Sequence, residues 1–436
     1  MEANSYTVKT QRHQNKMDTV FRCKILLFAV GMALVWQPSA SQELAPKETV
    51  TNRQRPAFDP IGVRLGGFQL FPQLDLAGVY DSNIFAREDP ETDDLIYVLA
   101  PRLELESNWG KHALRFGADT TILRYEDNDS EDREDYTIWA EGRVDTSASG
   151  FLGTGLRHAK RHEDRESPDD AGGFKPTEFY VSSFAASYEI RPDPRRLHGR
   201  LEGEYRRVDF QDSLGPAGPI DNDDRDRDEV RGTLRLGYAV RPTYSIFVQG
   251  DSRSIKYDER FDDDGFQRDS DGYRISVGAA LDVSGILFGD LLVGYRSDTF
   301  DDDRYSDVDG FSFGADLTWN ISGLTTLRFS GQQALETTTV EDASAIDATL
   351  FVLGIDHELL RNLILGLEWS TVEEDFQGID RKDDIDTIDF SARYLMNRRA
   401  ELVLAYSHRN RDTQPATSTG LEFTRDLVSL GVKLQL

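Results

Sequence analysis

The chain has 436 residues, a formal net charge of −28 at pH 7 and a hydrophobic content of 38%. This acidity argues against nucleic acid or anionic lipid as a partner. The composition resembles that of a soluble protein, but it does not exclude a membrane β-barrel, because only alternate residues of a barrel strand need be apolar.

The first 41 residues have the three-part pattern of a secretory signal. Basic residues come first, an uninterrupted apolar run follows at 25–36, and small residues near Ala40 and Ser41 suit a signal peptidase. The run is too short for a membrane anchor, which needs about 20 apolar residues. We therefore predict a signal peptide over 1–41. The only cysteine, Cys23, lies within it, so we expect no disulfide and no cysteine metal site in the mature protein.

Residues 42–67 are polar and contain several prolines. We interpret them as a short periplasmic lead-in to a domain that fills 68–436. No second long apolar segment follows, which excludes a helical inner-membrane protein.

From residue 68 onward, segments of ten to thirteen residues alternate apolar and polar side chains. That period is typical of a strand with two different faces. In 273–282, for example, Tyr273, Ile275 and Val277 alternate with Arg274 and Ser276. We count eighteen such segments, of which 199–210 and 345–357 are the least regular: 68–80, 95–106, 112–125, 135–145, 151–160, 177–189, 199–210, 228–240, 243–257, 273–282, 288–298, 310–320, 324–334, 345–357, 362–372, 385–395, 400–409 and 424–436.

The connections between these segments alternate between short turns and long acidic stretches. The predicted long stretches are 86–94, 126–135, 161–176, 211–227, 258–272, 298–309, 373–384 and 409–422. Bacterial outer-membrane barrels have short periplasmic turns and longer outer loops. A soluble β-sandwich would have strands of about five or six residues. These segments are long enough to cross a bilayer, and a sheet in lipid must close on itself. The sequence therefore predicts an all-β, transmembrane, antiparallel up-and-down barrel of about eighteen strands, with both chain ends periplasmic.

Aromatic residues near the segment ends suggest two girdles at the membrane surfaces. The expected girdle at the loop ends contains Tyr80, Tyr125, Tyr257, Tyr273, Tyr295, Phe311, Trp369 and Tyr406. The expected girdle at the turn ends contains Trp109, Phe151, Phe288, Trp319 and Tyr394.

The face opposite the apolar band carries charges of both signs. An arginine or lysine that points into lipid at mid-depth costs about 2–4 kcal/mol, so these side chains are expected to face the interior. One interpretation is an ion-paired lining that stiffens the wall; the other is a hydrophilic conduit whose arginines suit uronate or phosphate groups. The candidates for lining the lumen are Arg102, Glu104, Arg115, Asp119, Arg143, Arg231, Arg235, Arg253, Arg274, Arg296, Arg328 and Arg393.

Other chemistry has weak support in the sequence. The acidic stretches at 221–229, 262–265, 301–303 and 307–310 offer oxygen ligands, but they lack the full spacing of an EF-hand loop, so we assign no metal. No common catalytic motif or phosphate-binding loop occurs, and His158, His162, His357 and His408 are scattered. We predict neither an enzyme nor a cofactor.

Several stretches resemble one family, the exported barrels called putative β-barrel porin type 2. They include RPAFDPIGVRLGGF at 55–68, YDSNIF at 80–85, SNWGKH at 107–112, RDSDGYR at 268–274 and DHELLRN at 356–362. The resemblance covers about 55–436 and implies a barrel that works beside polysaccharide copolymerase and export proteins, carrying capsule or slime polymer through the outer membrane. The chain ends in Leu436, whereas such barrels more often end in an aromatic residue.

The leading hypothesis is therefore a non-enzymatic outer-membrane pore, surrounded by lipid and lipopolysaccharide, that assists export of an extracellular or capsular polysaccharide. One alternative is a general or solute-selective diffusion porin. A second is a structural or adhesive barrel whose acidic loops bind partners outside the cell.

Overall fold

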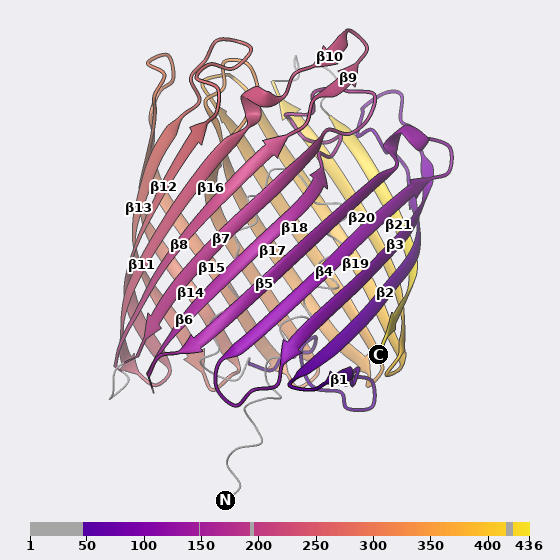
Figure 1. Ribbon diagram of the computed structural model, residues 1–436, viewed down its shortest axis with the longest axis vertical. Helices are drawn as coiled ribbons and strands as arrows, with labels where there is room; N and C mark the ends of the chain where they lie inside the picture. The colour runs from indigo at the N-terminus through magenta and orange to yellow at the C-terminus, as the bar shows by residue number, and fades with distance from the viewer. Residues whose placement is uncertain (1–46, 148, 192–195, 416–421) are drawn as a thin grey trace, which may run out of the picture.

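A computed structural model describes residues 47–147, 149–191, 196–415 and 422–436. Eighteen long strands form a closed antiparallel ring in which each strand pairs with its neighbours in the chain (Figure 1). The wall strands are β2 (Phe68–Asp81), β3 (Asp94–Ser107), β4 (Ala113–Tyr125), β5 (Arg133–Asp145), β6 (Gly150–His162), β7 (Glu178–Ile190), β8 (Leu197–Phe210), β11 (Arg227–Arg241), β12 (Tyr244–Tyr257), β13 (Ser270–Val283), β14 (Leu287–Phe300), β15 (Val308–Ser322), β16 (Thr325–Glu336), β17 (Ala345–Leu360), β18 (Leu363–Gln377), β19 (Lys382–Asn397), β20 (Ala400–Gln414) and β21 (Phe423–Gln435).

Smaller elements lie at the two ends of this ring. Strand β1 (Val63–Leu65) pairs with the first residues of β2, and β9 (Ser213–Gly215) forms a separate hairpin with β10 (Gly218–Ile220). Two 3-10 turns, η2 (Asp129–Glu131) and η3 (Asp223–Arg225), lie in the loops after β4 and β10. No helix in the described ranges is long and apolar enough to cross a membrane.

The eighteen predicted segments all correspond to wall strands, so the predicted fold class is confirmed. The two irregular segments, 199–210 and 345–357, form β8 and β17. The strands have 12 to 16 residues, more than the nine to eleven that a tilted strand needs to cross a bilayer. The predicted signal peptide, with its boundary at residue 41, and Cys23 lie outside the described residues.

The ring closes where the last strand meets the first. Residues Gln73–Asp81 of β2 pair antiparallel with Leu427–Gln435 of β21. An open sheet would expose a row of unpaired N–H and C=O groups, which lipid cannot satisfy. Closure thus explains how a chain with so many polar residues lies stably in a membrane.

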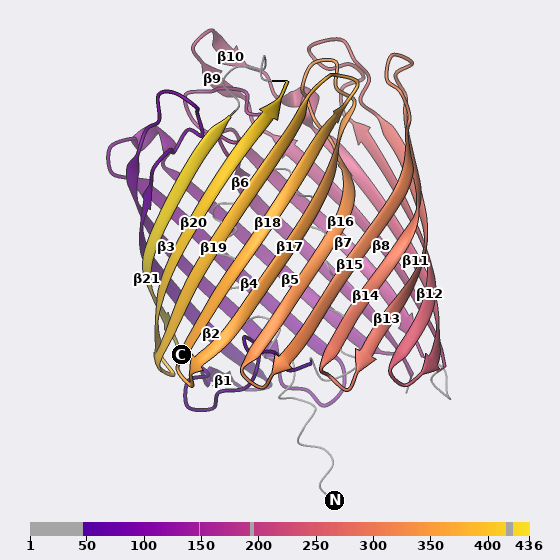
Figure 2. The ribbon, with the colours of Figure 1, turned by 180° about the vertical axis from the view of Figure 1, so that it is seen from behind.

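The connections divide the barrel into a turn end, with short connections, and a loop end, with longer ones. Figures 1 and 2 show the C-terminus and β1 at the turn end and the β9–β10 hairpin at the loop end. The predicted long stretch 373–384 is wrong, because β18 continues to Gln377 and β19 begins at Lys382. Alternation continues beyond the apolar band, and Phe376 is buried on the inner face against Ile346 and Ala348.

The outer surface confirms most of the predicted girdles. Tyr273, Tyr295, Phe311 and Trp369 point outward at the loop end and are 43–64% exposed. Four predicted members are wrong, because they share the inward register of charged residues: Tyr125, Tyr257, Phe151 and Phe288. The Arg143 guanidinium lies 4.4 Å from the centre of the Phe151 ring, which places this aromatic among the interior charges.

Candidate functional site

The inner wall is the first part of the candidate site, and its charges point inward because successive side chains of a strand alternate between faces. Some contacts skip one or two strands, which the concave face of a ring allows. Arg235 of β11 lies 2.6 Å from Asp290 of β14, and Arg253 of β12 lies 3.0 Å from Asp298 of β14. Arg296 of β14 contacts Asp347 of β17. Side chains from separate parts of the wall therefore meet inside the barrel.

The predicted lumen residues form local ion pairs rather than a row of free cations. Arg115 lies 2.6 Å from Glu104 and 3.1 Å from Glu141, while Arg102 is 3.4 Å from Glu104. The remaining pairs are Arg143–Asp145, Arg231–Glu229, Arg274–Asp251, Arg328–Asp356, Arg328–Glu368 and Arg393–Glu401, at 2.6–3.2 Å. Asp119 lies opposite Arg102 in the register of β3 and β4. These contacts favour the interpretation of an ion-paired lining. The inner face of the barrel nevertheless remains polar.

The second part of the site is a strap, residues 47–62, which lies along the inner wall at the turn end. It runs from β13, where Lys47 is 3.1 Å from Asp282, to β21, where the Gly62 N–H donates to the Leu436 carbonyl. Those strands are eight positions apart in the ring of eighteen. Between these points it also contacts β15, β16, β17, β18 and β19. The strap therefore follows the inner rim over almost half of the ring, and it narrows the turn end.

Two anchors hold the strap. Val50 is fully buried against the inward side chains of Ile364 and Leu395. Arg55 is buried and donates to Glu358 of β17 at 2.7 Å, and Arg53 contacts the same carboxylate at 3.4 Å. Burial lowers the pKa of the Arg55 guanidinium although Glu358 opposes the shift. Glu358 is thus the main countercharge for this segment.

The loop end is crossed by the third part of the site, the loop bridge. It consists of the loop 163–177, between β6 and β7, and the hairpin tip 333–348, formed by the ends of β16 and β17. The Asp169 carboxylate accepts hydrogen bonds from the Thr338 hydroxyl at 2.7 Å and the Thr339 N–H at 2.8 Å. The two segments start from opposite halves of the ring, so their contact spans the opening.

Buried ion pairs fix the loop 163–177 on both sides. Glu166 is 2% exposed and lies 2.7 Å from Arg409 of β20. Glu163 lies 2.7 Å from Arg225 in η3, and burial raises the pKa of Glu163 although Arg225 opposes the shift. Breaking such a pair leaves a buried charge without its partner, which costs about 3–5 kcal/mol. The loop 163–177 is therefore held in a defined position at the loop end.

Sequence reasoning missed the residues that form the strap and the loop bridge. Arg409 and Arg411 have the alternation of an inward face, which was a usable signal. Glu166 and Glu358 gave none, because an acidic residue in a polar loop or at a strand end is typical of solvent exposure. Their partners are 243 and 303 residues away, and only the closed ring brings them together.

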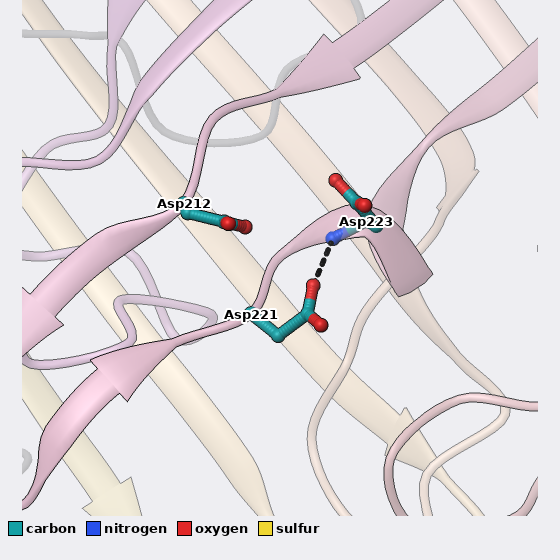
Figure 3. Close-up of side chains that lie close together, drawn as sticks. All are labelled: Asp212, Asp221 and Asp223. Carbon is teal, nitrogen blue, oxygen red and sulfur yellow. Dashed lines mark hydrogen bonds between the residues drawn. The ribbon is translucent and has the colours of Figure 1, made fainter.

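A compact carboxylate group lies in the described part of the acidic loops. Asp212, Asp221 and Asp223 place one oxygen each within 4.8 Å of one another, and the Asp223 N–H donates to Asp221 (Figure 3). Repulsion from Asp212 and Asp221 raises the pKa of Asp223. All three residues are exposed, as acidic loop residues commonly are, and this group alone does not establish a cation site.

Asp226, beside that group, gives a testable pH dependence. Burial, together with repulsion from Asp209, raises its pKa to about 6, although the Phe210 N–H and Arg207 favour the charged form. Because the folded-state value exceeds the ordinary value of 3.8, stability from this group is present below about pH 4 and is lost as the pH rises through about 6. We expect amide exchange in 211–226, corrected for its intrinsic rate, to accelerate over that interval.

The change Asp226→Asn retains an acceptor for the Phe210 N–H and has no charge to gain. It should reduce the pH dependence of the corrected exchange rates between pH 4 and 6, as measured by mass spectrometry. Equal corrected exchange rates at pH 4 and pH 6 in the wild-type protein would contradict the assignment to Asp226.

The histidines lie apart from one another. His158 and His162 of β6 lie 2.9 Å from Ser182 and 2.8 Å from Asp135. His357 of β17 is 3.0 Å from Thr325, while His408 of β20 is 2.9 Å from Asp426. Each therefore bonds to a different neighbouring strand, and these contacts do not gather them into one centre.

One known protein family matches most of the chain. Residues 55–436 match the family model described as "Putative beta-barrel porin 2". No curated protein sequence matches the chain.

Three similar solved structures are also barrels. They are the siderophore receptor PirA from Acinetobacter baumannii (9% identity, 84% of this chain and 80% of that chain, TM-score 0.44), OccAB4 from the same species (11%, 84% and 98%, 0.44) and OpdO from Pseudomonas aeruginosa (15%, 85% and 97%, 0.43).

Proposed function

The chain belongs to the putative β-barrel porin 2 family, and from that premise we propose that it is a pore that assists export of an extracellular or capsular polysaccharide. It is a porin-like β-barrel integral to the outer membrane. The proposed role in export rests on one observation: a ring of eighteen strands has an inner face of paired charges, and its own segments narrow each opening. At sixteen to eighteen strands an aqueous lumen is expected.

Paired charges suit a polymer that slides. A wall of free arginines would hold an anionic polymer tightly, whereas arginines already bonded to carboxylates offer many weak polar contacts. The strap and the loop bridge suit a conduit that stays shut to small solutes until polymer is delivered. In this proposal the turn end and both termini are periplasmic, the loops face outward among lipopolysaccharide, and copolymerase and export proteins deliver the polymer at the turn end.

Deletion of the gene tests the proposal. Surface polymer should fall to the level of a strain that cannot synthesise it, while polymer made at the inner membrane continues to accumulate. A plasmid copy of the wild-type gene should restore surface polymer. Undiminished surface polymer in the deletion strain would contradict export.

Conductance of the purified protein in planar bilayers separates export from solute diffusion. We expect small, infrequent openings, because one buried, ion-paired segment crosses the loop end and another narrows the turn end. Steady, large openings of the wild-type protein would favour the diffusion porin instead.

A further inference from the structure

The wall has a break in its hydrogen bonding near the loop end. Strands β15 and β16 pair from Ser322 and Thr325 at the turn end only as far as Gly314 and Gln332. Beyond that point Val308–Phe313 pair with β14 alone, and Gln333–Glu336 pair with β17 alone. The upper ends of β15 and β16 in Figure 2 are thus two neighbouring strand edges without a shared ladder.

The break exists because the hairpin tip 333–348 is displaced into the barrel. Arg253 of β12 donates to the Leu335 carbonyl at 2.7 Å, although β12 and β16 are four strand spacings apart, roughly 19 Å along the wall. Arg268, between β12 and β13, donates to the Thr338 and Ala343 carbonyls at 2.6 and 3.0 Å. Leu335 is buried against the inward side chains of Val308 and Phe300.

The same residues also fit the wall. If the observed register continued upward, Phe313, Ser312 and Phe311 would face Gln333, Ala334 and Leu335. Leu335 would then stand beside Phe311, which is 64% exposed on the outer face, and Ala334 would face inward beside Ser312. That arrangement preserves the alternation of both strands. The Ser312 hydroxyl, at present fully buried, makes no hydrogen bond in the break.

We propose that the hairpin tip 333–348 is a gate with two positions. In the inner position it lies across the loop end. In the outer position, which we call zipped, the end of β16 forms hydrogen bonds with β15 and completes the wall. In the inner position it is held by Arg253, Arg268 and its contact with Asp169. In the outer position the unpaired edges of β15 and β16 bond to each other, which removes polar backbone from a strand edge at the membrane surface. Zipping separates Thr338 from Asp169 and opens the loop end.

This inference concerns movement of the wall and does not depend on what the barrel carries. A cysteine pair detects the zipped state directly, in a Cys23→Ser background that contains no other thiol. Ser312→Cys with Ala334→Cys places the two thiols directly opposite only when β16 has zipped, because cross-strand Cβ atoms are then about 4.5–5.5 Å apart. We expect this pair to oxidise slowly in the purified full-length protein, and severalfold faster when Asp169→Ala breaks the loop bridge.

The matched control is Asp316→Cys with Ser330→Cys, which belongs to the same ladder and is already paired. It should oxidise quickly whether or not Asp169 is replaced. In planar bilayers the oxidised 312–334 pair should conduct more than its reduced form, while oxidation of the control pair should change nothing. A 312–334 pair that stays reduced under conditions that fully oxidise the control, with and without Asp169→Ala, would overturn the proposal.

Discussion

Replacing Asp81 with alanine is expected to weaken the barrel by about 3–5 kcal/mol. Asp81 ends β2, is fully buried, and accepts bonds from Arg425 of β21 at 2.5 and 3.0 Å. These two strands close the ring, and their ladder ends at this level. The variant leaves the Arg425 guanidinium buried beside Glu166, which is 3.9 Å away and already bonded to Arg409.

The loss should appear as a lower urea midpoint for unfolding from vesicles, followed by tryptophan fluorescence. A suitable control is Glu373→Ala, which removes an exposed partner of Lys382 at 2.8 Å and should change stability by less than about 1 kcal/mol. Equal midpoints for the two variants would show that the Asp81–Arg425 pair does not secure the closure.

Replacing Glu358 with alanine is expected to release the strap without opening the wall. The Arg55 guanidinium loses the carboxylate that lies 2.7 Å away, and Arg53 loses the same partner. An uncompensated buried charge costs about 3–5 kcal/mol, which raises the population of the released strap by at least about 100-fold. Cleavage that follows a rapid opening reports this population. Trypsin should therefore cut after Arg53 at a correspondingly higher rate.

The matched control is Glu48→Ala, which removes an exposed carboxylate from the same strap and keeps the backbone carbonyl that bonds to Asn320. Its cleavage rate should match that of the wild type. The Glu358→Ala protein should also conduct more in planar bilayers, because the strap narrows the turn end. Unchanged cleavage after Arg53 would show that the other contacts of the strap hold it without Glu358.

The sequence predicted the wall because alternation is a local property. The segment at 273–282 has the same two faces whether or not its neighbours are known, and it became β13. Aromatic side chains were less certain, since Tyr257 and Phe288 fit an outer girdle by composition but follow the inward register of Arg253 and Asp290. Counting the register from a charged residue, rather than from the strand end, would have placed them correctly.

The segments across the openings could not be predicted, because they depend on contacts between distant parts of the chain. Arg55 and Glu358 are 303 residues apart, and no pattern near either residue marks the other. The break between β15 and β16 was also hidden, since both strands alternate normally through it. Individual strands are determined by local sequence, whereas the width of the openings is determined by ring closure.

The path of the strap also has a consequence for biogenesis. It precedes β2 in the chain, yet its binding surface is assembled from β13 to β21, the second half of the molecule. The earliest part of the described polypeptide must therefore wait, undocked, until the latest strands have been inserted. The moment at which Arg53 becomes resistant to protease would therefore mark the completion of each newly made barrel.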